Sequence, residues 1–215
     1  MSGYEASMKD ELLQIFPTPI LITKYEENID EETKYIENLE YTKQKDTKGF
    51  RSVNSSLFKN ELLKKIKNFC EESITKYTEN VLNTKQRLVT TQCWTNKILP
   101  GARHHEHVHQ NSIISGVFYF KAGGKLPPIQ FTKEFQSGMK LEPIKYNVIT
   151  AETYLIPCTP GELLLFPSSL RHSVPINHSE ETRYSMSFNT FGIGSLGSEI
   201  SATYLNIKSI VNENN

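Results

Sequence analysis

From about residue 86 onward the sequence consists of short apolar segments, and this pattern limits the possible folds more than any other feature. Gly and Pro turns separate the segments, which is the pattern of short strands in an all-β sandwich or barrel. Roughly eight such strands fit a jelly roll, also called a double-stranded β-helix. The segments that predict strands cover residues 87–98, 102–108, 113–120, 129–131, 146–149, 154–156, 162–166, 172–175 and 183–191.

The first part of the chain has a different pattern, in which helices would cover a sheet. Residues 19–25 predict a strand, residues 29–41 predict a helix with an acidic first turn, and residues 42–59 predict a loop. From Asn60, a residue type that caps helices, apolar side chains recur every three or four positions as far as Val81. This spacing predicts a long amphipathic helix that packs on the outside of the barrel.

The expected fold is mainly β with flanking helices, an α+β arrangement in which a cupin-like jelly roll is covered by N-terminal helices. We expect a single domain, because 215 residues are ample for one core. Residues 14–85 would form the N-terminal strand and helical cover, residues 86–191 the jelly-roll core, and residues 192–215 a flexible C-terminal extension. Residues 130–153 are poorly patterned and predict a mobile insertion beside the mouth of the site.

Charge and cysteine content argue against several classes of function. The chain has 24 basic and 24 acidic residues, so no global charge attracts it to nucleic acid or to an anionic membrane. No apolar stretch approaches the roughly 18 residues that a membrane span needs, and the first residues lack the profile of a signal peptide, which predicts a cytoplasmic protein. Cys70, Cys93 and Cys158 lie far apart, so neither a disulfide framework nor a thiolate zinc site is expected. The oligomeric state stays open.

Four of the six histidines lie within six residues, and this run predicts a metal site. On a strand, His105, His107 and His109 would share one face, while His104 and Glu106 would point away. Strand residues four apart lie roughly 13 Å from each other, whereas imidazole ligands must approach an ion to about 2.0–2.1 Å, with zinc as the guide. At most two neighbours, His107 and His109, would therefore bind one ion.

A third ligand has to come from elsewhere in the fold, and His172 is the best candidate because it follows a buried-looking strand. His178 lies in a polar turn and is expected to be exposed to solvent. The alternative is that the histidine run is a surface patch or an adventitious metal binder. His172 would then be an ordinary polar residue at the end of a strand.

The segment around His107 also resembles a known family. Residues 107–112, followed by residues 115–119, are similar to a motif of the 2-oxoglutarate- and iron(II)-dependent oxygenases, and the likeness spans roughly residues 14 to 191. The other similar blocks are Ile15-Phe16-Pro17-Thr18-Pro19, Trp94-Thr95-Asn96 with Gly101, Pro160-Gly161-Glu162-Leu163-Leu164-Leu165-Phe166-Pro167-Ser168 before His172, and Arg183-Tyr184-Ser185-Met186-Ser187-Phe188-Asn189.

The resemblance implies a jelly roll with iron at one mouth, held by a histidine-x-acid pair and a distal histidine. His107 and His172 fit this pattern, whereas His109 stands where most of the wider superfamily has Asp or Glu, as in the His-x-His subgroup that the chain resembles. His109 would complete a three-histidine site, support the ligands from outside, or leave the position to water; we expect it to bind the metal. Residue types alone do not select iron, because imidazole also suits copper, nickel and zinc.

The resemblance further implies that Arg183 and Ser185 grip the far carboxylate of 2-oxoglutarate. A guanidinium matches a carboxylate with two parallel hydrogen bonds, and consecutive jelly-roll strands alternate between facing sheets, so His172 and Arg183 can face one cavity. Tyr119 falls where related enzymes place a tyrosine hydroxyl against the same group. The alternatives are that Arg183 pairs with a surface glutamate and that Tyr119 is a core aromatic. Trp94 is expected to be core packing outside the site.

The activity implied is that of an oxidoreductase that uses Fe(II), 2-oxoglutarate and O2. It would hydroxylate an unactivated C–H bond of a small-molecule or peptidyl substrate and convert 2-oxoglutarate to succinate and carbon dioxide. Two other functions are open: a cupin-type dioxygenase with three histidines and no keto acid, and a jelly-roll binding module without catalysis. The substrate is not identified by the sequence, because loop side chains determine it.

Overall fold

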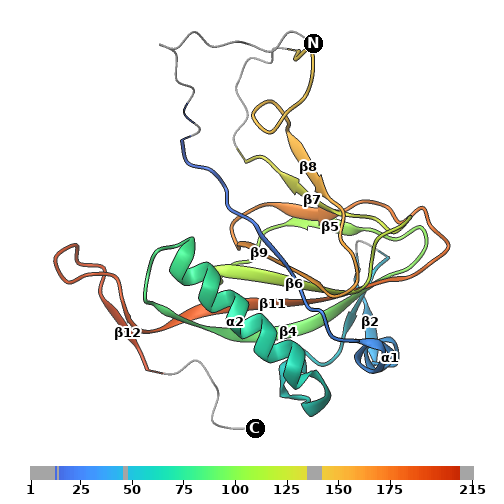
Figure 1. Cartoon of the computed structure of the whole chain (residues 1–215), viewed down its shortest axis with the longest axis horizontal. Coiled ribbons are helices and arrows are strands. Elements are labelled where there is room, and N and C mark those ends of the chain that lie inside the picture. Colours follow the sequence, from blue (N-terminus) through green and yellow to red (C-terminus); the bar gives the residue numbers. More distant parts are fainter. Residues whose placement is uncertain (1–12, 14, 46–47, 135–141, 209–215) are drawn as a thin grey trace.

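The structure is a computed structural model that describes residue 13 and residues 15–45, 48–134 and 142–208. Two antiparallel sheets lie against each other, and a long helix crosses the outer face of the larger one (Figure 1). The larger sheet has the order β1-β9-β6-β11-β4-β3-β2, with β12 paired to the end of β11. The smaller sheet has the order β5-β10-β7-β8.

The elements have the following bounds. The larger sheet contains β1 (Leu21–Lys24), β2 (Tyr41–Lys43), β3 (Phe50–Ser52), β4 (Arg87–Ile98), β6 (Ile114–Lys121), β9 (Glu162–Pro167), β11 (Arg183–Leu196) and β12 (Leu205–Ile207). The smaller sheet contains β5 (His104–His107), β7 (Ile129–Thr132), β8 (Thr153–Ile156) and β10 (His172–Val174). The helices are α1 (Asp30–Glu37) and α2 (Lys64–Asn80), and short 3-10 turns occupy Leu57–Lys59 and Glu61–Leu63.

The centre of the larger sheet is buried on both faces. Alternate residues of β6 point in opposite directions, so Phe118 packs toward the helices while Val117 and Tyr119 pack toward the smaller sheet. The strand β9 does the same with Leu163 and Leu164. One apolar layer therefore lies under the helices and a second lies between the two sheets, and this second layer supports the cavity described below.

The helical cover forms where the apolar spacing predicts it. The Asn60 side chain accepts a hydrogen bond from the Leu62 backbone N–H, which caps the turn that leads into α2. Ile66, Cys70 and Ile74 of α2 are buried against the larger sheet. Among the described residues, no helix is long and apolar enough to cross a membrane.

Three predictions about the periphery are wrong. Residues 42–59 are not only loop, because β2 and β3 form a hairpin that joins the larger sheet beside β4. Residues 146–149 form a turn rather than a strand, since the Asn147 side chain accepts hydrogen bonds from the backbone N–H groups of Ile149 and Thr150. The C-terminal extension is expected to be flexible, but within residues 192–208 the strand β11 continues to Leu196 and the chain returns as β12, which pairs with it.

The return of the tail depends on a glycine. Gly197 has a φ of +70°, and a Cβ atom there would lie 2.2 Å from the Thr203 carbonyl oxygen. Glycine therefore permits a close backbone approach at this position. Part of the predicted insertion, residues 135–141, lies outside the described residues.

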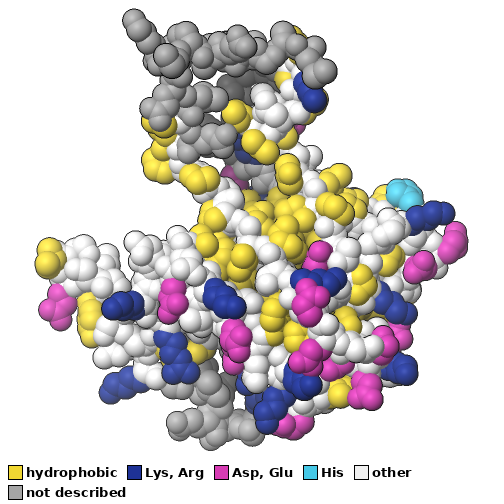
Figure 2. Space-filling model, in the orientation of Figure 1, with side chains coloured by type: hydrophobic (Ala, Val, Ile, Leu, Met, Phe, Trp, Pro, Cys, Tyr) yellow, Lys and Arg dark blue, Asp and Glu magenta, His cyan; other side chains and the backbone are white. Residues whose placement is uncertain are grey.

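The β7–β8 hairpin projects from one end of the molecule (Figure 1), and apolar side chains gather on the face below it (Figure 2). Tyr154 and Leu155 of β8 are more than half exposed. Within the described part of the chain, β8 is the last strand of its sheet, so apolar surface coincides with a strand edge.

Gly116 of β6 is expected to be intolerant of any side chain. It pairs with Phe188 of β11, and an added Cβ would lie 2.0 Å from the Phe188 ring, which is fully buried and packs 5.5 Å from the Phe58 ring. We expect Gly116→Ala to reduce the free energy of unfolding by about 1–3 kcal/mol, the usual cost of overpacking a core. Denaturant unfolding measures this change.

A second substitution checks that the clash is the cause. Phe188→Leu makes room at the same contact, so the double variant should lose less stability than the two single variants added together. Additive losses, or a Gly116→Ala variant as stable as the parent, would contradict the steric explanation.

Candidate metal centre

A β-bulge in β5 determines which histidines face the space between the sheets. His107 lies opposite His172 of β10, and His104 lies opposite Val174, so three steps along β5 match two steps along β10. Residues opposite each other in a ladder point to the same face, so His104 joins His107 on the side of His172. The prediction that His104 points away is therefore wrong, because strict alternation takes no account of a bulge.

Three imidazoles converge at this place. His107, His109 and His172 each offer a nitrogen, and these nitrogens lie within 4.8 Å of one another. The Nε2 atoms of His109 and His172 are 3.2 Å apart. Two nitrogens bound to one ion at about 2.0–2.1 Å would be separated by roughly 3.0–3.4 Å, depending on the angle at the ion. The observed spacing is thus that of two ligands on one metal.

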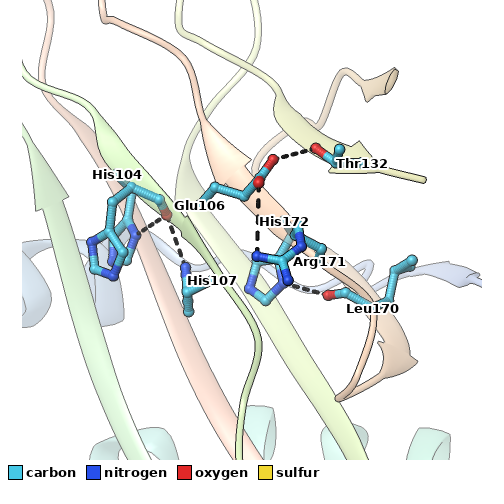
Figure 3. Close-up of polar contacts among 8 residues, drawn as sticks. His104, Glu106, His107, Thr132, Leu170, Arg171 and His172 are labelled. Carbon is cyan, nitrogen blue, oxygen red and sulfur yellow. Dashed lines mark hydrogen bonds and ion pairs between the residues drawn. The ribbon is translucent and has the colours of Figure 1, made fainter. Parts of the chain in front are cut away.

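Backbone carbonyls set the tautomers of two of these rings. His107 donates from Nδ1 to the His105 carbonyl oxygen at 2.9 Å, and His172 donates from Nδ1 to the Leu170 carbonyl oxygen at 2.9 Å (Figure 3). A carbonyl can only accept, so Nδ1 carries the proton and Nε2 keeps its lone pair. This is the arrangement that protein metal sites use to orient a histidine ligand. The side chains therefore fit a metal ion.

The imidazoles are also held in their neutral form. Burial, followed by the neighbouring imidazoles, lowers the pKa of His172 to about 3 and that of His109 to about 4. Burial lowers the pKa of His107 as well, and lowers that of His104 to about 3. A metal binds only the deprotonated ring, so at neutral pH all four are ready to bind.

The same shifts predict how the metal-free protein responds to acid. Below about pH 6.5 the unfolded chain takes up protons on His104, His109 and His172, whereas the folded chain does not until the pH approaches 4 to 3. The stability is fully present above pH 6.5 and is lost as the pH falls. We expect the melting temperature of the metal-free protein to fall between pH 7 and pH 5, and to fall less steeply in His104→Gln.

His178→Gln serves as the control, because His178 is exposed and lies outside the cluster. A melting temperature that stays constant from pH 7 to pH 5, or equal slopes in the two variants, would contradict this explanation.

The metal-binding groups in the described part of the chain contain histidines only. The nearby carboxylate of Glu106 is turned outward, where it accepts a hydrogen bond from the Thr132 hydroxyl at 2.5 Å and lies 3.8 Å from Arg171 (Figure 3). His109 stands at the position where the resemblance gives most of the wider superfamily an Asp or Glu, and Asn189 forms a hydrogen bond with its ring. The candidate centre is therefore made of three imidazoles.

The other end of the cavity carries a buried positive charge. Arg183 is 2% exposed, donates from Nη1 to the Ser185 hydroxyl at 3.0 Å, and lies 5.0 Å from the centre of the Tyr119 ring. Its Nε has no hydrogen-bond partner, and no salt bridge reaches it from the described residues. Burial excludes the alternative in which Arg183 pairs with a surface glutamate.

Tyr119 adds a second buried polar group beside Arg183. Its hydroxyl is buried beside the weakly hydrogen-bonding thiol of Cys158; burial raises the pKa of Tyr119 well above the ordinary value, so the hydroxyl keeps its proton. Tyr119 lies directly opposite Ser185 in the ladder of β6 and β11. An unpaired guanidinium N–H and a hydroxyl with no strong hydrogen-bond partner therefore occupy one buried region, which suits an anion that accepts hydrogen bonds.

A cavity of about 40 Å³ joins the two ends. Its wall comes from both sheets, with His172 of β10 on one side and Arg183 of β11 on the other. The lining residues are Trp94, Asn96, Ile98, His104, His107, His109, Val117, Ile129, His172, Ser173, Val174, Arg183, Ser185 and Ser187. A larger cavity of about 350 Å³, between the end of α2 and the start of β4, contains none of these side chains.

Trp94 belongs to the wall of this cavity and not to the core. Its ring stacks on the His109 ring, with centroids 5.8 Å apart and an angle of 26° between the planes. The prediction of plain core packing for Trp94 is therefore wrong. The period of two through Trp94, Asn96 and Ile98 could have shown that these residues share one face.

Comparison with known proteins relates the part of the chain that carries this site to one family. The model of a family described as "Putative 2OG-Fe(II) oxygenase" matches residues 92–189, which run from β4 to β11. This match is shorter than the range of 14 to 191 suggested by the sequence motifs, but it includes all three histidines and Arg183. No protein of curated function matches the sequence.

Solved structures share the fold at low identity. HygX from Streptomyces hygroscopicus, solved with nickel, 2-oxoglutarate and hygromycin B bound, is 10% identical with a TM-score of 0.59, over 80% of this chain and 82% of that chain. A prolyl-4-hydroxylase of Pseudomonas putida is 12% identical with a TM-score of 0.56, over 80% and 92%. SnoN, an epimerase of nogalamycin biosynthesis, is 10% identical with a TM-score of 0.58, over 81% and 78%.

These likenesses confirm the jelly roll with its helical cover, while the family match covers the strands that carry the site. Through residues 92–189, the chain is therefore similar to the 2OG-Fe(II) oxygenases, a family of oxidoreductases.

Proposed function

We propose that this protein is a 2-oxoglutarate- and iron(II)-dependent dioxygenase that hydroxylates an unactivated C–H bond of a small-molecule or peptidyl substrate. The observation that carries the proposal is the buried, unpaired Arg183 guanidinium in the same cavity as three neutral imidazoles. A buried cation is costly unless an anion pairs with it. The 2-oxoglutarate dianion supplies that partner.

Each part of the cavity has a role in this proposal. His107, His109 and His172 would hold the iron, and their Nε2 lone pairs support this assignment. Bound iron and 2-oxoglutarate together supply the activation of dioxygen and the oxidising power for the C–H bond, and succinate and carbon dioxide are the coproducts.

Arg183, Ser185 and Tyr119 would bind the distal carboxylate. The Ser185 oxygen accepts from Arg183, so its own O–H remains available to donate. Together with the unpaired Nε of Arg183 and the Tyr119 hydroxyl, three donors serve one anion. The guanidinium fork provides both charge and orientation.

The apolar wall would keep water away from the reacting bond. Ile98, Val117 and Ile129 line the cavity from different strands, and Trp94 covers His109. A dry site strengthens the ion pair at Arg183 and prevents side reactions. Free, buried cysteines and an iron(II) cofactor both suit the reducing cytoplasm, where we propose that the protein acts.

Hydroxylation is the reaction that we propose, although the fold supports other outcomes. The titles of similar structures name a prolyl-4-hydroxylase and an epimerase. The substrate enters the proposal only as a class, because the loops that contact it differ between proteins of one fold.

A cupin-type dioxygenase without a keto acid is the second candidate, and the all-imidazole centre favours it. Such an enzyme would leave Arg183 without a partner. Binding of the keto acid therefore separates the two candidates.

The test is an anaerobic titration of the metal-stripped protein with iron(II) and then 2-oxoglutarate. We expect the visible charge-transfer band of a chelated keto acid. Iron binding without the band would indicate the three-histidine dioxygenase, and no iron binding would indicate a jelly-roll binding module.

A further inference from the structure

His104 and His105 are not used by the function proposed above, although the bulge brings both beside a metal ligand. We propose that His104, His105 and His107 form a second transition-metal site, for ions such as Zn(II) or Cu(II), which cannot be filled at the same time as the first. The inference shares only His107 with the proposed oxygenase centre.

The three rings have the spacing of the first site. One ligand nitrogen from each of His104, His105 and His107 lies within 4.8 Å of the other two. The ring centroids are 4.9 Å apart for His104 and His105, 4.7 Å for His104 and His107, and 5.0 Å for His105 and His107. The corresponding distances in the first site are 4.4, 5.0 and 5.1 Å. Modest ring rotations would bring either set to one ion.

One backbone carbonyl fixes the tautomer of two of the proposed ligands. The His105 carbonyl oxygen accepts from Nδ1 of His107 at 2.9 Å and from Nδ1 of His104 at 3.2 Å. Both rings therefore have the proton on Nδ1 and a free lone pair on Nε2. His104 thus has the same tautomer as His107, although His104 is not a ligand of the proposed oxygenase centre.

The two sites compete for His107. Its Nδ1 is occupied by the His105 carbonyl, so only Nε2 can bind a metal. An ion held by His104, His105 and His107 would remove one ligand from the centre that includes His109 and His172. Occupation of one site therefore excludes the other.

The ligands and their exposure indicate which ions the second site would take. Three imidazoles leave a fourth position for water, which suits tetrahedral zinc. Among divalent ions, nitrogen ligands bind copper and zinc more tightly than iron. The His105 side chain is exposed, whereas His172 in the first site is buried, so an ion from solution can reach the second site directly.

A zinc titration against a chromophoric chelator tests the proposal in the full-length protein. His172→Ala disables the first site but should still bind one zinc ion per chain. Adding His105→Ala should weaken that binding by at least about 10- to 100-fold, as expected when a supporting group is lost. Adding His178→Ala instead should leave it unchanged, because His178 is an exposed histidine outside the cluster.

Circular dichroism and thermal unfolding of each variant establish that the fold is retained. The proposal is overturned if His172→Ala binds no zinc, or if His105→Ala and His178→Ala have equal effects. Exclusion is tested in the unmodified chain, which should take up a single zinc ion; a second ion that His105→Ala removes would overturn it. None of these results depends on 2-oxoglutarate, so a failure of the second metal site can be distinguished from a failure of the proposed oxygenase function.

Discussion

Arg183→Met should abolish tight 2-oxoglutarate binding while leaving the metal-free protein at least as stable as the parent. Truncating one partner of a buried charge pair costs about 2–5 kcal/mol, which corresponds to an affinity loss of roughly 30- to several-thousand-fold. In the free protein the guanidinium is buried with an unpaired Nε and no salt bridge from the described residues. An apolar side chain of similar length removes that cost, and buried charges replaced in this way are often neutral or stabilising.

The affinity is measured from the charge-transfer band in an anaerobic titration, and the stability from denaturant unfolding without ligand. Arg183→Lys keeps the charge but loses the fork, so it should bind with intermediate affinity. Arg87→Met, at the exposed start of β4, is the matched control. A strongly destabilised Arg183→Met variant that still binds the keto acid would show that Arg183 serves the fold and not the cosubstrate.

His172→Ala should reduce the affinity for iron(II) by at least about 100-fold, because loss of a ligand exceeds the 10- to 100-fold cost of losing a supporting hydrogen bond. His172 joins the other imidazoles from the neighbouring strand β10, and its Nε2 is 3.2 Å from that of His109. His107→Ala should behave in the same way. Iron content after anaerobic dialysis at increasing chelator concentration measures the change.

His109 needs a separate comparison, since a ligand and a supporting residue can both weaken binding when removed. His109→Asp restores a ligand atom, so it should recover much of the iron that His109→Ala loses. His178→Ala should have no effect. If His109→Asp and His109→Ala lose iron equally, His109 acts on the centre without binding the metal.

Much of the fold could be predicted because local patterns and tertiary packing agree there. The apolar spacing from Asn60 to Val81 predicted α2, and the alternating runs predicted β4 to within its exact bounds. The hairpin of β2 and β3 could not be predicted, because strands of three residues have too little pattern and form through pairing with β4. Its stability comes from distant residues.

In the candidate site, residue types were more informative than geometry. His107, His172 and Arg183 were identified from their motifs, and the structure places all three at one cavity. The inward position of His104 could not be predicted, because a bulge depends on the register with β10 and has no signature in β5 alone. The stacking of Trp94 on His109 likewise depends on how the chain turns after β5.

Because of the bulge, either His104 or His105 could supply the side chain opposite Val174. Without the extra residue, His107 would remain opposite His172, and His105 would take the place of His104 opposite Val174. With or without the bulge, therefore, one of these two adjacent histidines points its imidazole toward the cavity. Loss of the extra residue, which would normally place a different kind of side chain opposite Val174, here leaves an imidazole at that position.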